Sequence, residues 1–537
     1  MQLVAYGAQD VYLTGNPQIT FFKVVYRRHT NFSIETVEHT LGGNPDFGRK
    51  ATVTVTRNGD LATKMYLRVV LKGDVTNGSN WAYVTRLGHA LMKSVELEIG
   101  GSKIDKQYGT WLDIWYELTA PSGTARGYNR MIGNVSELTD MASTHGEYTM
   151  YIPLQFWFCR NTGLALPLIA LQYHEVRVHF EFANASELVR YNTAGSVPAI
   201  GMKDASLLVD YIYLDSEERR RFAQVGHEYL IEQLQFTGEE SARDNVQKYK
   251  LGFNHPTKEL VWAAKSGRFM GKTFLAENVD DLAKQVVLAK FALDTDGVTA
   301  AATIGLTPTA VAWDEAVTGG EKLTVDNDAT DVLDLIFNTN AKVTVGGTDL
   351  FSLIDGATVH ANDNGVTVTS VSHRLTQVEL SQHLGESGVV DGRIASSGNS
   401  TQASPLGSGV VVNHHSNYGI FMDGSRNPVT EALVQLNGHD RFDKREGDYF
   451  NYVQPGQHHS NTPADGVNVY SFAIHPEQHQ PSGTANLSRI DNTQLNVWYD
   501  TSAGIDFIDA ANKLYVFGFS YNVLRVMSGM GGLAYSN

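Results

Sequence analysis

Three histidines in the chain are each followed two residues later by a glutamate, a spacing with which one β-strand can present two metal ligands. The pairs are His145 with Glu147, His179 with Glu181, and His475 with Glu477. Metal oxygenases built from antiparallel sheets add a distant histidine to such a pair. Only His179 and Glu181 fall in a convincing strand, whose alternation places them opposite its apolar side chains. We therefore expect this pair to face solvent or an interface rather than a metal ion.

Histidines also gather nearer the C-terminus of the chain. His458 and His459 are adjacent, and His475 and His479 follow a short distance further on. Both segments are rich in proline and glutamine, which favours loops over regular elements. We interpret these four side chains as solvated loop residues rather than metal ligands.

The remaining candidates do not complete a known catalytic or metal-binding pattern. Asp326, Asp328 and Asp331 lack the glycine and the terminal glutamate of an EF-hand loop, so we predict a solvated acidic turn. Cys159 follows an aromatic strand, which predicts a buried and inert thiol. The sequence contains no Gly-x-Ser-x-Gly elbow, Walker loop or Cys-x-x-Cys pair. We accordingly expect a structural protein that is not an enzyme and that uses no metal and no cofactor.

Composition narrows the class of protein further. The 537 residues suggest more than one domain, and the net charge of -16 argues against direct contact with nucleic acid, which requires a basic face. The single cysteine excludes an internal disulfide and suits a reducing compartment. The first residues do not form a signal peptide, and no uninterrupted apolar stretch is long enough to span a bilayer as a helix.

Short runs that alternate polar and apolar residues dominate the first part of the chain and predict β-strands. These strands lie near residues 33–41, 51–57, 64–72, 93–99, 102–106, 148–158, 173–182 and 207–215. Eight short antiparallel strands in succession are typical of a jelly roll, in which two sheets pack face to face. Residues 111–118 predict a short helix across the end of this sandwich, and the charged run 215–221 predicts a solvated linker.

The second part of the chain repeats this pattern. Predicted strands lie near residues 229–236, 246–253, 259–263, 432–436, 439–444, 468–475, 492–500 and 512–526. Hairpin turns at Gly100-Gly101 and at Asn437-Gly438 each join two strands at equivalent places in the two parts. The repeat predicts a second jelly roll built like the first.

The second part differs from the first by a long insertion, about residues 266–415, between its third and fourth strands. This segment is rich in Thr, Ala, Asp and Gly, and it has strand-like pieces at 342–345 and 365–369. It predicts a small β-rich lobe, with a long and partly ordered loop as the alternative. The predicted organisation is an N-terminal arm (1–24), a first jelly roll (25–215), a linker (216–225) and a second jelly roll (226–537) that carries the insertion.

Several longer segments are distinctive in their residue order and are spread over the whole chain. They are residues 6–23, 26–32, 153–158, 163–176, 480–484, 488–492 and 522–535. These segments resemble the major capsid proteins of the nucleocytoplasmic large DNA viruses, especially those of algae and other protists. The resemblance covers nearly the whole chain except about 266–415.

The resemblance implies two jelly rolls per chain and a homotrimer whose six jelly rolls form a pseudo-hexagonal capsomer. Implied partners are neighbouring capsomers, minor capsid proteins and penton proteins in an icosahedral virion shell assembled in the host cytoplasm. The shell would face an internal membrane only indirectly and would not contact nucleic acid. The N-terminal arm would lie at the capsomer base, and the insertion would project outward as a tower. A lectin-like surface binder is the alternative, and the absence of a signal peptide and of cysteine pairs argues against it.

Sites for N-linked glycans are a separate expectation. Asn-x-Ser/Thr sequons occur at Asn31, Asn77, Asn134, Asn184, Asn399 and Asn486. The resemblance implies that outer loops can be glycosylated. We therefore select Asn399, within the insertion, as the candidate glycosylation site.

Overall fold

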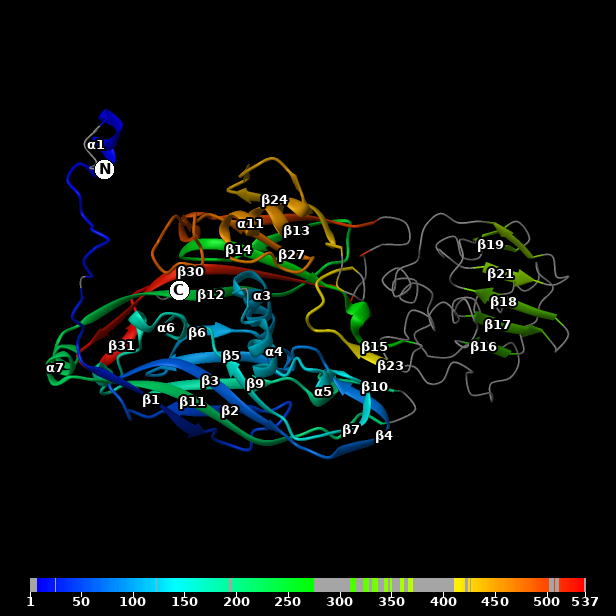
Figure 1. The fold of residues 1–537 in the computed structure, drawn as a ribbon, viewed down its shortest axis with the longest axis horizontal. Coiled ribbons are helices and arrows are strands. Elements are labelled where there is room, and N and C mark those ends of the chain that lie inside the picture. Colours follow the sequence, from blue (N-terminus) through cyan, green and yellow to red (C-terminus); the bar gives the residue numbers. More distant parts are fainter. Residues whose placement is uncertain are drawn as a thin grey trace, which may run out of the picture.

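Antiparallel β-sheets form most of the computed structural model of the chain (Figure 1). The model describes residues 7–274 except 25, 122 and 193–195, the strands between residues 310 and 369, and residues 410–535 except 421–423, 425, 502–506 and 508–510. No helix in these described residues is long and apolar enough to cross a membrane.

The first half of the chain folds into two four-stranded sheets that share one core. The first sheet has the order β1 (Phe32–Thr40), β11 (Met202–Leu214), β3 (Leu61–Leu71), β8 (Thr149–Pro153). The second has the order β2 (Lys50–Val55), β9 (Val176–Phe182), β5 (Met92–Ile99), β6 (Ser102–Gln107). These are the eight strands that the sequence pattern predicts. Leu67 and Val69 of β3 pack in the same buried cluster as Val178 and Phe180 of β9, as expected for a jelly roll.

The second half repeats this arrangement. One sheet has the order β12 (His227–Ser241), β30 (Lys513–Met527), β14 (Pro256–Lys265), β27 (Val467–Ser471). The other has the order β13 (Val246–Leu251), β29 (Thr493–Tyr499), β24 (Val429–Leu436), β25 (His439–Asp440). In both halves the first strand therefore pairs with the last long strand, which pairs in turn with the third predicted strand. The chain is a double jelly roll, as predicted.

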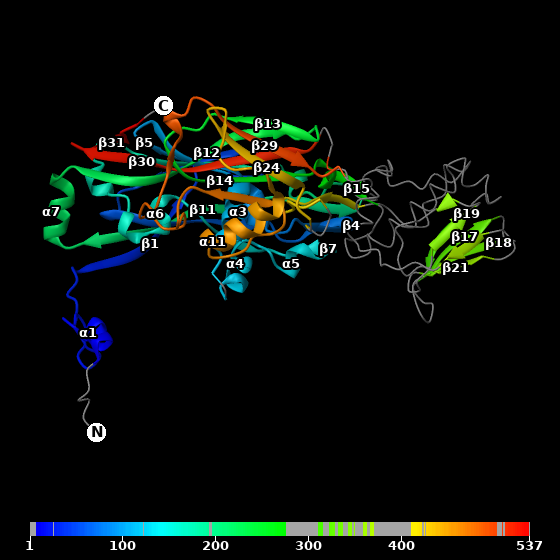
Figure 2. The ribbon, with the colours of Figure 1, turned by 90° about the horizontal axis from the view of Figure 1, so that it is seen from above.

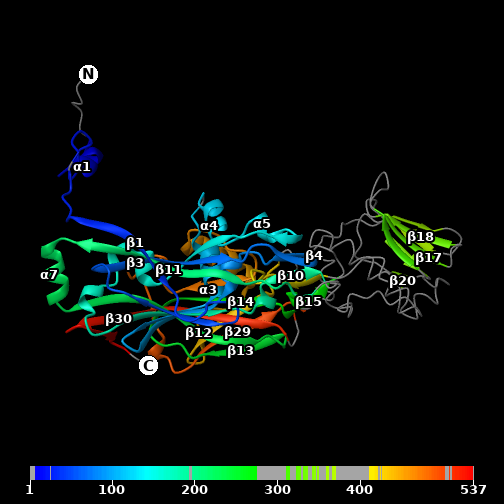
Figure 3. The same ribbon diagram turned by 90° about the horizontal axis from the view of Figure 1, so that it is seen from below.

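A further sheet, which the sequence pattern did not predict, joins the two halves. Its order is β15 (Met270–Phe274), β23 (Val410–Asn413), β10 (Val189–Asn192), β4 (Val75–Tyr83), β7 (Ala142–His145). Figure 3 shows β4, β10 and β15 together at one end of the jelly rolls. Four of these strands are only four or five residues long, and β4 carries the polar sequence Asn77-Gly78-Ser79-Asn80, so none has a clear alternating pattern.

This sheet holds the two ends of the long insertion side by side. β15 and β23 pair antiparallel, and Phe274 lies directly opposite Val410. The strands between them form two sheets. One has the order β16 (Ala310–Asp314), β17 (Lys322–Asn327), β18 (Asp331–Ile336), β21 (Thr358–Ala361), and the other has the order β20 (Thr348–Asp349), β19 (Lys342–Val345), β22 (Val366–Thr369).

Two predictions about local structure were wrong in part, and the predicted linker is solvated, as expected, but helical. The strand predicted at 148–158 ends at Pro153, and a short helix, α6 (Trp157–Arg160), follows it. The predicted linker is the helix α7 (Ser216–Gln224), because the Asp215 side chain accepts a hydrogen bond from the Ser216 N–H and acidic residues occupy the first turn. The predicted helix at 111–118 exists as α3 (Gly109–Thr119), but it lies between the two jelly rolls rather than across the end of one.

The N-terminal residues are exposed, whereas the C-terminal strand packs against the first jelly roll. Residues 7–24, with the helix α1 (Ala8–Thr14), are exposed and extend away from the jelly rolls (Figure 2). The C-terminal strand β31 (Met530–Leu533) pairs with β30 and returns to the first jelly roll, where Gly531 bonds with the His174 ring (Gly531 O to Nδ1, 2.9 Å). Leu524 and Val526 of β30 belong to the core of the first half.

We predict that residues 275–409 can be removed without unfolding the jelly rolls. Because Phe274 and Val410 are direct cross-strand partners, a two-residue Asn-Gly turn should join β15 to β23. The thermal midpoint should stay within about 2 °C of that of the full chain, which corresponds to roughly 2 kcal/mol at an unfolding entropy of about 2.1 cal/mol/K per residue.

The matched control is the larger deletion of residues 266–415, which also removes β15 and β23. This variant should have a lower midpoint or be insoluble, because it uncovers the edge of β10 that pairs with β23. Aggregation of the 275–409 deletion itself would show that the removed segment belongs to the core.

Candidate functional site at the interface between the two jelly rolls

The helix α3 carries the apolar contact between the two jelly rolls. Its large side chains recur at positions 111, 114, 115 and 118, the spacing that places them on one helix face. Trp111 lies 5.3 Å from Phe517 and Trp115 lies 5.3 Å from Phe519, measured between ring centroids. Both phenylalanines belong to β30, so the face of the second jelly roll rests on a helix supplied by the first. Figure 1 shows α3 between the two layers.

The same helix carries a buried carboxylate that binds both halves. Asp113 accepts hydrogen bonds from Arg86 Nη1 at 2.8 Å and from Tyr418 Oη at 2.8 Å, and His89 Nδ1 lies 3.1 Å away. Arg86 and His89 come from the start of α2 (Leu87–Leu91) in the first half, and Tyr418 follows β23. Burial alone would raise the pKa of Asp113, but Arg86 and His89 overcome this effect and hold the pKa well below its usual range. Asp113 is therefore ionised throughout the neutral range.

A second buried carboxylate, Glu232 of β12, lies between two cations. Arg160 Nη2 of α6 approaches Glu232 Oε2 at 2.5 Å, and Lys258 Nζ of β14 binds Glu232 Oε1. The Lys258 ammonium also donates to the Pro476 carbonyl at 2.6 Å. The Arg160 guanidinium lies over Phe519, with its carbon 4.8 Å from the ring centroid. Because Arg160 belongs to the first jelly roll, this group of charges joins the two halves.

The edges of two sheets also meet at this interface. Leu234 N of β12 donates to Asp105 Oδ1 of β6 at 3.1 Å, and Gln233 Nε2 donates to the Ile104 carbonyl. Burial raises the pKa of Asp105 to about 6. These contacts satisfy backbone groups at the edge strands β6 and β12, since unpaired backbone groups on an open edge favour aggregation.

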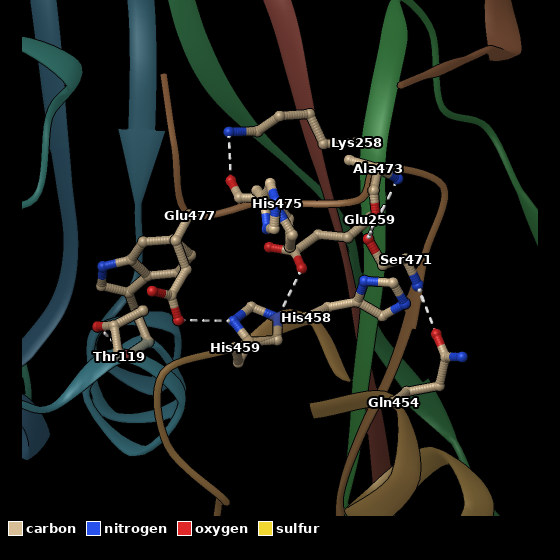
Figure 4. Close-up of polar contacts among 12 residues, drawn as sticks. Thr119, Lys258, Glu259, Gln454, His458, His459, Ser471, Ala473, His475 and Glu477 are labelled. Atoms are coloured by element: carbon tan, nitrogen blue, oxygen red, sulfur yellow. Dashed lines mark hydrogen bonds and ion pairs between the residues drawn. The ribbon is translucent and has the colours of Figure 1, made fainter. Parts of the chain in front are cut away.

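The side chain of His459, which we predicted to be a solvated loop residue, is completely buried. Figure 4 shows the carboxylates on either side of its ring. Its Nε2 lies 2.8 Å from Glu259 Oε2 and its Nδ1 lies 3.1 Å from Glu477 Oε1. Burial lowers the pKa of His459, but the two carboxylates outweigh burial and raise it to about 9. The ring is therefore an imidazolium that donates to both carboxylates.

The prediction for His459 was wrong because its partners lie far away in the sequence. Glu259 is 200 residues earlier, in β14, and the local proline and glutamine content gave no sign of it. The prediction holds for His475, which is exposed. It holds only in part for His458, which is half-buried at the end of the helix α11 (Gln454–His458) and places Nδ1 3.0 Å from the Ile474 carbonyl. His479 is half-buried.

The histidines of two His-x-Glu pairs place their ring nitrogens against protein groups. His179 is half-buried on the face opposite the core, as predicted, with Nδ1 2.9 Å from Thr52 Oγ1 and Nε2 3.0 Å from Glu98 Oε2. His145 is buried, and both of its ring nitrogens contact backbone carbonyls. Within the described ranges, no three His, Cys, Asp or Glu residues are grouped as metal ligands.

The remaining candidates are the single cysteine, three aspartates and the sequon in the insertion. Cys159 is buried, as predicted, and burial raises the pKa of its thiol to about 12. The side chains of Asp326, Asp328 and Asp331, and the whole of Asn399, lie outside the part of the chain that the structure describes.

Sequence analysis did not identify the charged residues of the interface. Lys258 and Glu259 stand in a strand whose other side chains are nearly all apolar, and Arg160 interrupts an aromatic segment. Charged residues inside apolar runs are seldom fully buried unless they are paired. The position of these charged residues within apolar runs therefore indicated buried ion pairs, but it did not indicate which residues are the partners.

Comparison with known proteins agrees with this architecture. Residues 20–215 match the family model described as major capsid protein N-terminus, and residues 218–532 match the model described as large eukaryotic DNA virus major capsid protein. Capsid protein 1 of Acanthamoeba polyphaga mimivirus is 42% identical over 598 aligned residues, which cover 100% of this chain and 99% of that protein. The major capsid protein of Phaeocystis pouchetii virus is 42% identical over 572 aligned residues, with the same coverage.

Solved structures of viral capsid proteins superpose on this chain. A chain of the PBCV-1 virus capsid is 31% identical and superposes with a TM-score of 0.60, covering 96% of this chain and 100% of that one. The Faustovirus major capsid protein shares the fold with a TM-score of 0.58 at 12% identity, covering 97% of this chain and 94% of that one.

We predict that Glu232→Gln lowers the free energy of unfolding by about 3–5 kcal/mol, because it leaves Arg160 and Lys258 buried without their counter-charge. Urea unfolding at neutral pH measures this change. The matched control is Glu228→Gln on the same strand, which breaks an exposed pair with Arg525 and should cost less than about 1 kcal/mol. Equal costs for the two variants would contradict the role assigned to Glu232.

The raised pKa of His459 predicts a pH dependence of stability. The protonated ring is favoured in the folded state, so its contribution is fully present below pH 6.5 and is lost as the pH rises through about 9. The loss should be on the order of 3 kcal/mol. The difference in unfolding free energy between the unchanged chain and His459→Gln should therefore fall by this amount between pH 6 and 10, and this comparison cancels the titration of Lys265, whose pKa of about 8 lies in the same range. His458→Gln, at the half-buried neighbour, should show no such pH-dependent difference. A difference that stays constant with pH in His459→Gln would contradict the raised pKa of His459.

Proposed function

The chain belongs to the family of major capsid proteins of large eukaryotic DNA viruses, and we propose that three copies of it associate into a pseudo-hexagonal capsomer of an icosahedral shell. The protein is thus a structural capsid protein rather than an enzyme. The observation that carries the proposal is the identical strand order of the two jelly rolls. Three chains with two similar units each provide six similar units around one axis, and closed symmetry is the usual state of such assemblies.

A pseudo-hexagonal tile requires that the two jelly rolls of one chain keep a fixed relative orientation. The buried charges at their interface supply this rigidity, because a shift of one roll would separate Glu232 from Arg160 or Asp113 from Tyr418. Each separation would leave a charge or a polar group buried without its partner, which costs several kcal/mol. The interface therefore acts as a fixed joint rather than a hinge.

The partners of the capsomer follow from the same proposal. Each capsomer would contact neighbouring capsomers edge to edge, together with minor capsid and penton proteins, in a virion assembled in the host cytoplasm. Direct contact with nucleic acid is not part of the proposal, because the net charge of -16 opposes it.

The N-terminal arm, residues 1–24, would contribute to contacts between chains at the base of the capsomer. The arm and the residues that follow it expose large apolar side chains, including Tyr12, Phe21, Phe22 and Tyr26, each at least 88% exposed. Apolar side chains gathered on an exposed segment mark a surface that another protein covers.

The insertion would project from the outer face of the capsomer. Its two ends leave from the neighbouring strands β15 and β23 at one end of the jelly rolls. An outward direction leaves the sides of the capsomer free to contact neighbouring capsomers. A glycan on Asn399 would then lie on the outer surface of the shell.

We predict that the purified chain sediments at micromolar concentration as a single species of three times 59.0 kDa. Analytical ultracentrifugation measures the mass. The deletion of residues 275–409 provides the control, because it should lower the mass of each chain while the species remains a trimer. A stable monomer of the full chain would contradict the proposal, and a monomer of the deletion variant alone would place the insertion in the contact between chains.

A further inference from the structure

A cleft of about 810 Å³ lies between the two jelly rolls at the start of α3. The first half contributes the turn from β6 into α3, with Tyr108 and Thr110. The second half contributes the end of β14 and the start of β30, with Lys265, Lys513 and Tyr515. The capsid role assigned above does not use this cleft.

The cleft holds more cationic groups than its carboxylates neutralise. Lys106, Lys265 and Lys513 have no carboxylate within 4.0 Å among the described residues. The other cations of the cleft are paired, Arg86 with Asp113 at 2.8 Å and Lys93 with Glu181 at 3.7 Å. Two further carboxylates line the cleft. Glu187 accepts a hydrogen bond from Asn184, and Glu239 accepts one from Tyr515 Oη at 3.2 Å.

Two of the unpaired lysines oppose each other across a strand pair. Lys265 of β14 is the direct antiparallel partner of Lys513 of β30. Residues at such positions point to the same face with their Cβ atoms about 5 Å apart, and like charges there repel. An anion between them would convert this repulsion into attraction.

Lys265 is also buried, with 9% of its surface exposed. Its Nζ donates to Thr110 Oγ1 at 3.1 Å and lies 5.3 Å from the centre of the Tyr515 ring. Burial lowers its pKa to about 8, although the carboxylates of Asp113 and Glu239 partly oppose this effect. An ammonium that is buried without a counter-charge is rare in proteins.

The helix α3 begins at the same place. It has eleven residues, its first residues Gly109 and Thr110 line the cleft, and no side chain caps its N-terminus. The first N–H groups of a helix have no partner within the helix, and its N-terminus carries a partial positive charge. This end of α3 thus adds to the positive potential around Lys265.

We propose that this cleft binds a small molecule that carries several phosphate groups, with Lys265 and Lys513 on either side of one group and Lys106 on a second. The volume of the cleft exceeds what a single phosphate ion fills. Both inorganic polyphosphate and a nucleotide present this chemistry. The rings of Tyr108 and Tyr515, which both pack against Phe236, also line the cleft, and the base of a nucleotide would contact them whereas polyphosphate would not.

Calorimetric titration of the full chain with inorganic tripolyphosphate, in buffer without divalent cations, tests the proposal. Saturable binding is expected. Lys106→Gln combined with Lys513→Gln should weaken it about 100-fold, since each lost charge-assisted contact costs about tenfold. The matched control is Lys248→Gln combined with Lys250→Gln, which removes the same charge from exposed positions of β13 and should leave the affinity unchanged.

The proposal is overturned if tripolyphosphate shows no saturable binding, or if the two double variants bind it equally well. Inorganic phosphate alone should bind much more weakly than tripolyphosphate, and equal affinities would overturn the assignment of several phosphate groups. Adenosine triphosphate distinguishes the two sources. Affinity equal to that of tripolyphosphate supports a polyphosphate ligand, and tighter binding that Tyr515→Leu removes supports a nucleotide.

Discussion

A carboxylate that is buried between two β-sandwiches must be matched by cations or donors, and in this protein the matching groups come from both sandwiches. Asp113 and Glu232 each occupy such a position, one on the helix between the jelly rolls and one on the first strand of the second roll. Buried ion pairs contribute little net stability, because desolvation offsets their attraction. Their effect is on geometry, since any other docking of the rolls leaves charges unmatched. The apolar contacts of Trp111 and Trp115 favour association of the two rolls, and the buried charges determine the relative orientation in which the rolls associate.

The two jelly rolls share a strand order but are not equivalent in their surroundings. The first roll supplies α3, α6 and the edge of β6 to the interface, and the second receives them on the face of β12, β30 and β14. The sheet that combines β4, β7 and β10 with β15 and β23 adds a second connection at one end. The two similar units are thus an asymmetric pair. The first jelly roll supplies the elements of the interface, and the second carries the long insertion.

The sequence predicted the parts of this structure that depend on local periodicity. Val178 and Phe180 alternate with polar residues, and the strand containing them faces inward as that alternation requires. The apolar face of α3 was likewise visible at 111, 114, 115 and 118, although its place between the rolls was not. Local patterns cannot show which residues distant in the sequence contact each other. His459 lies in a segment with the composition of a loop, yet its side chain is buried against Glu259. β4 likewise has too many polar residues to be recognised as a strand.

The pairing of β30 with β12 has a consequence for how the chain matures. His227 is opposite Val526, so the first strand of the second jelly roll must wait for nearly 300 residues to be synthesised before it gains its neighbour. Contacts this distant in sequence form slowly and only after the intervening chain is available. β31 then binds the first roll through His174, so strands that are synthesised after both rolls have begun to form contact both of them. A chain that is truncated near its C-terminus would lack the central strand of the sheet that rests on α3. Incomplete copies would therefore be excluded from assembly by the topology itself.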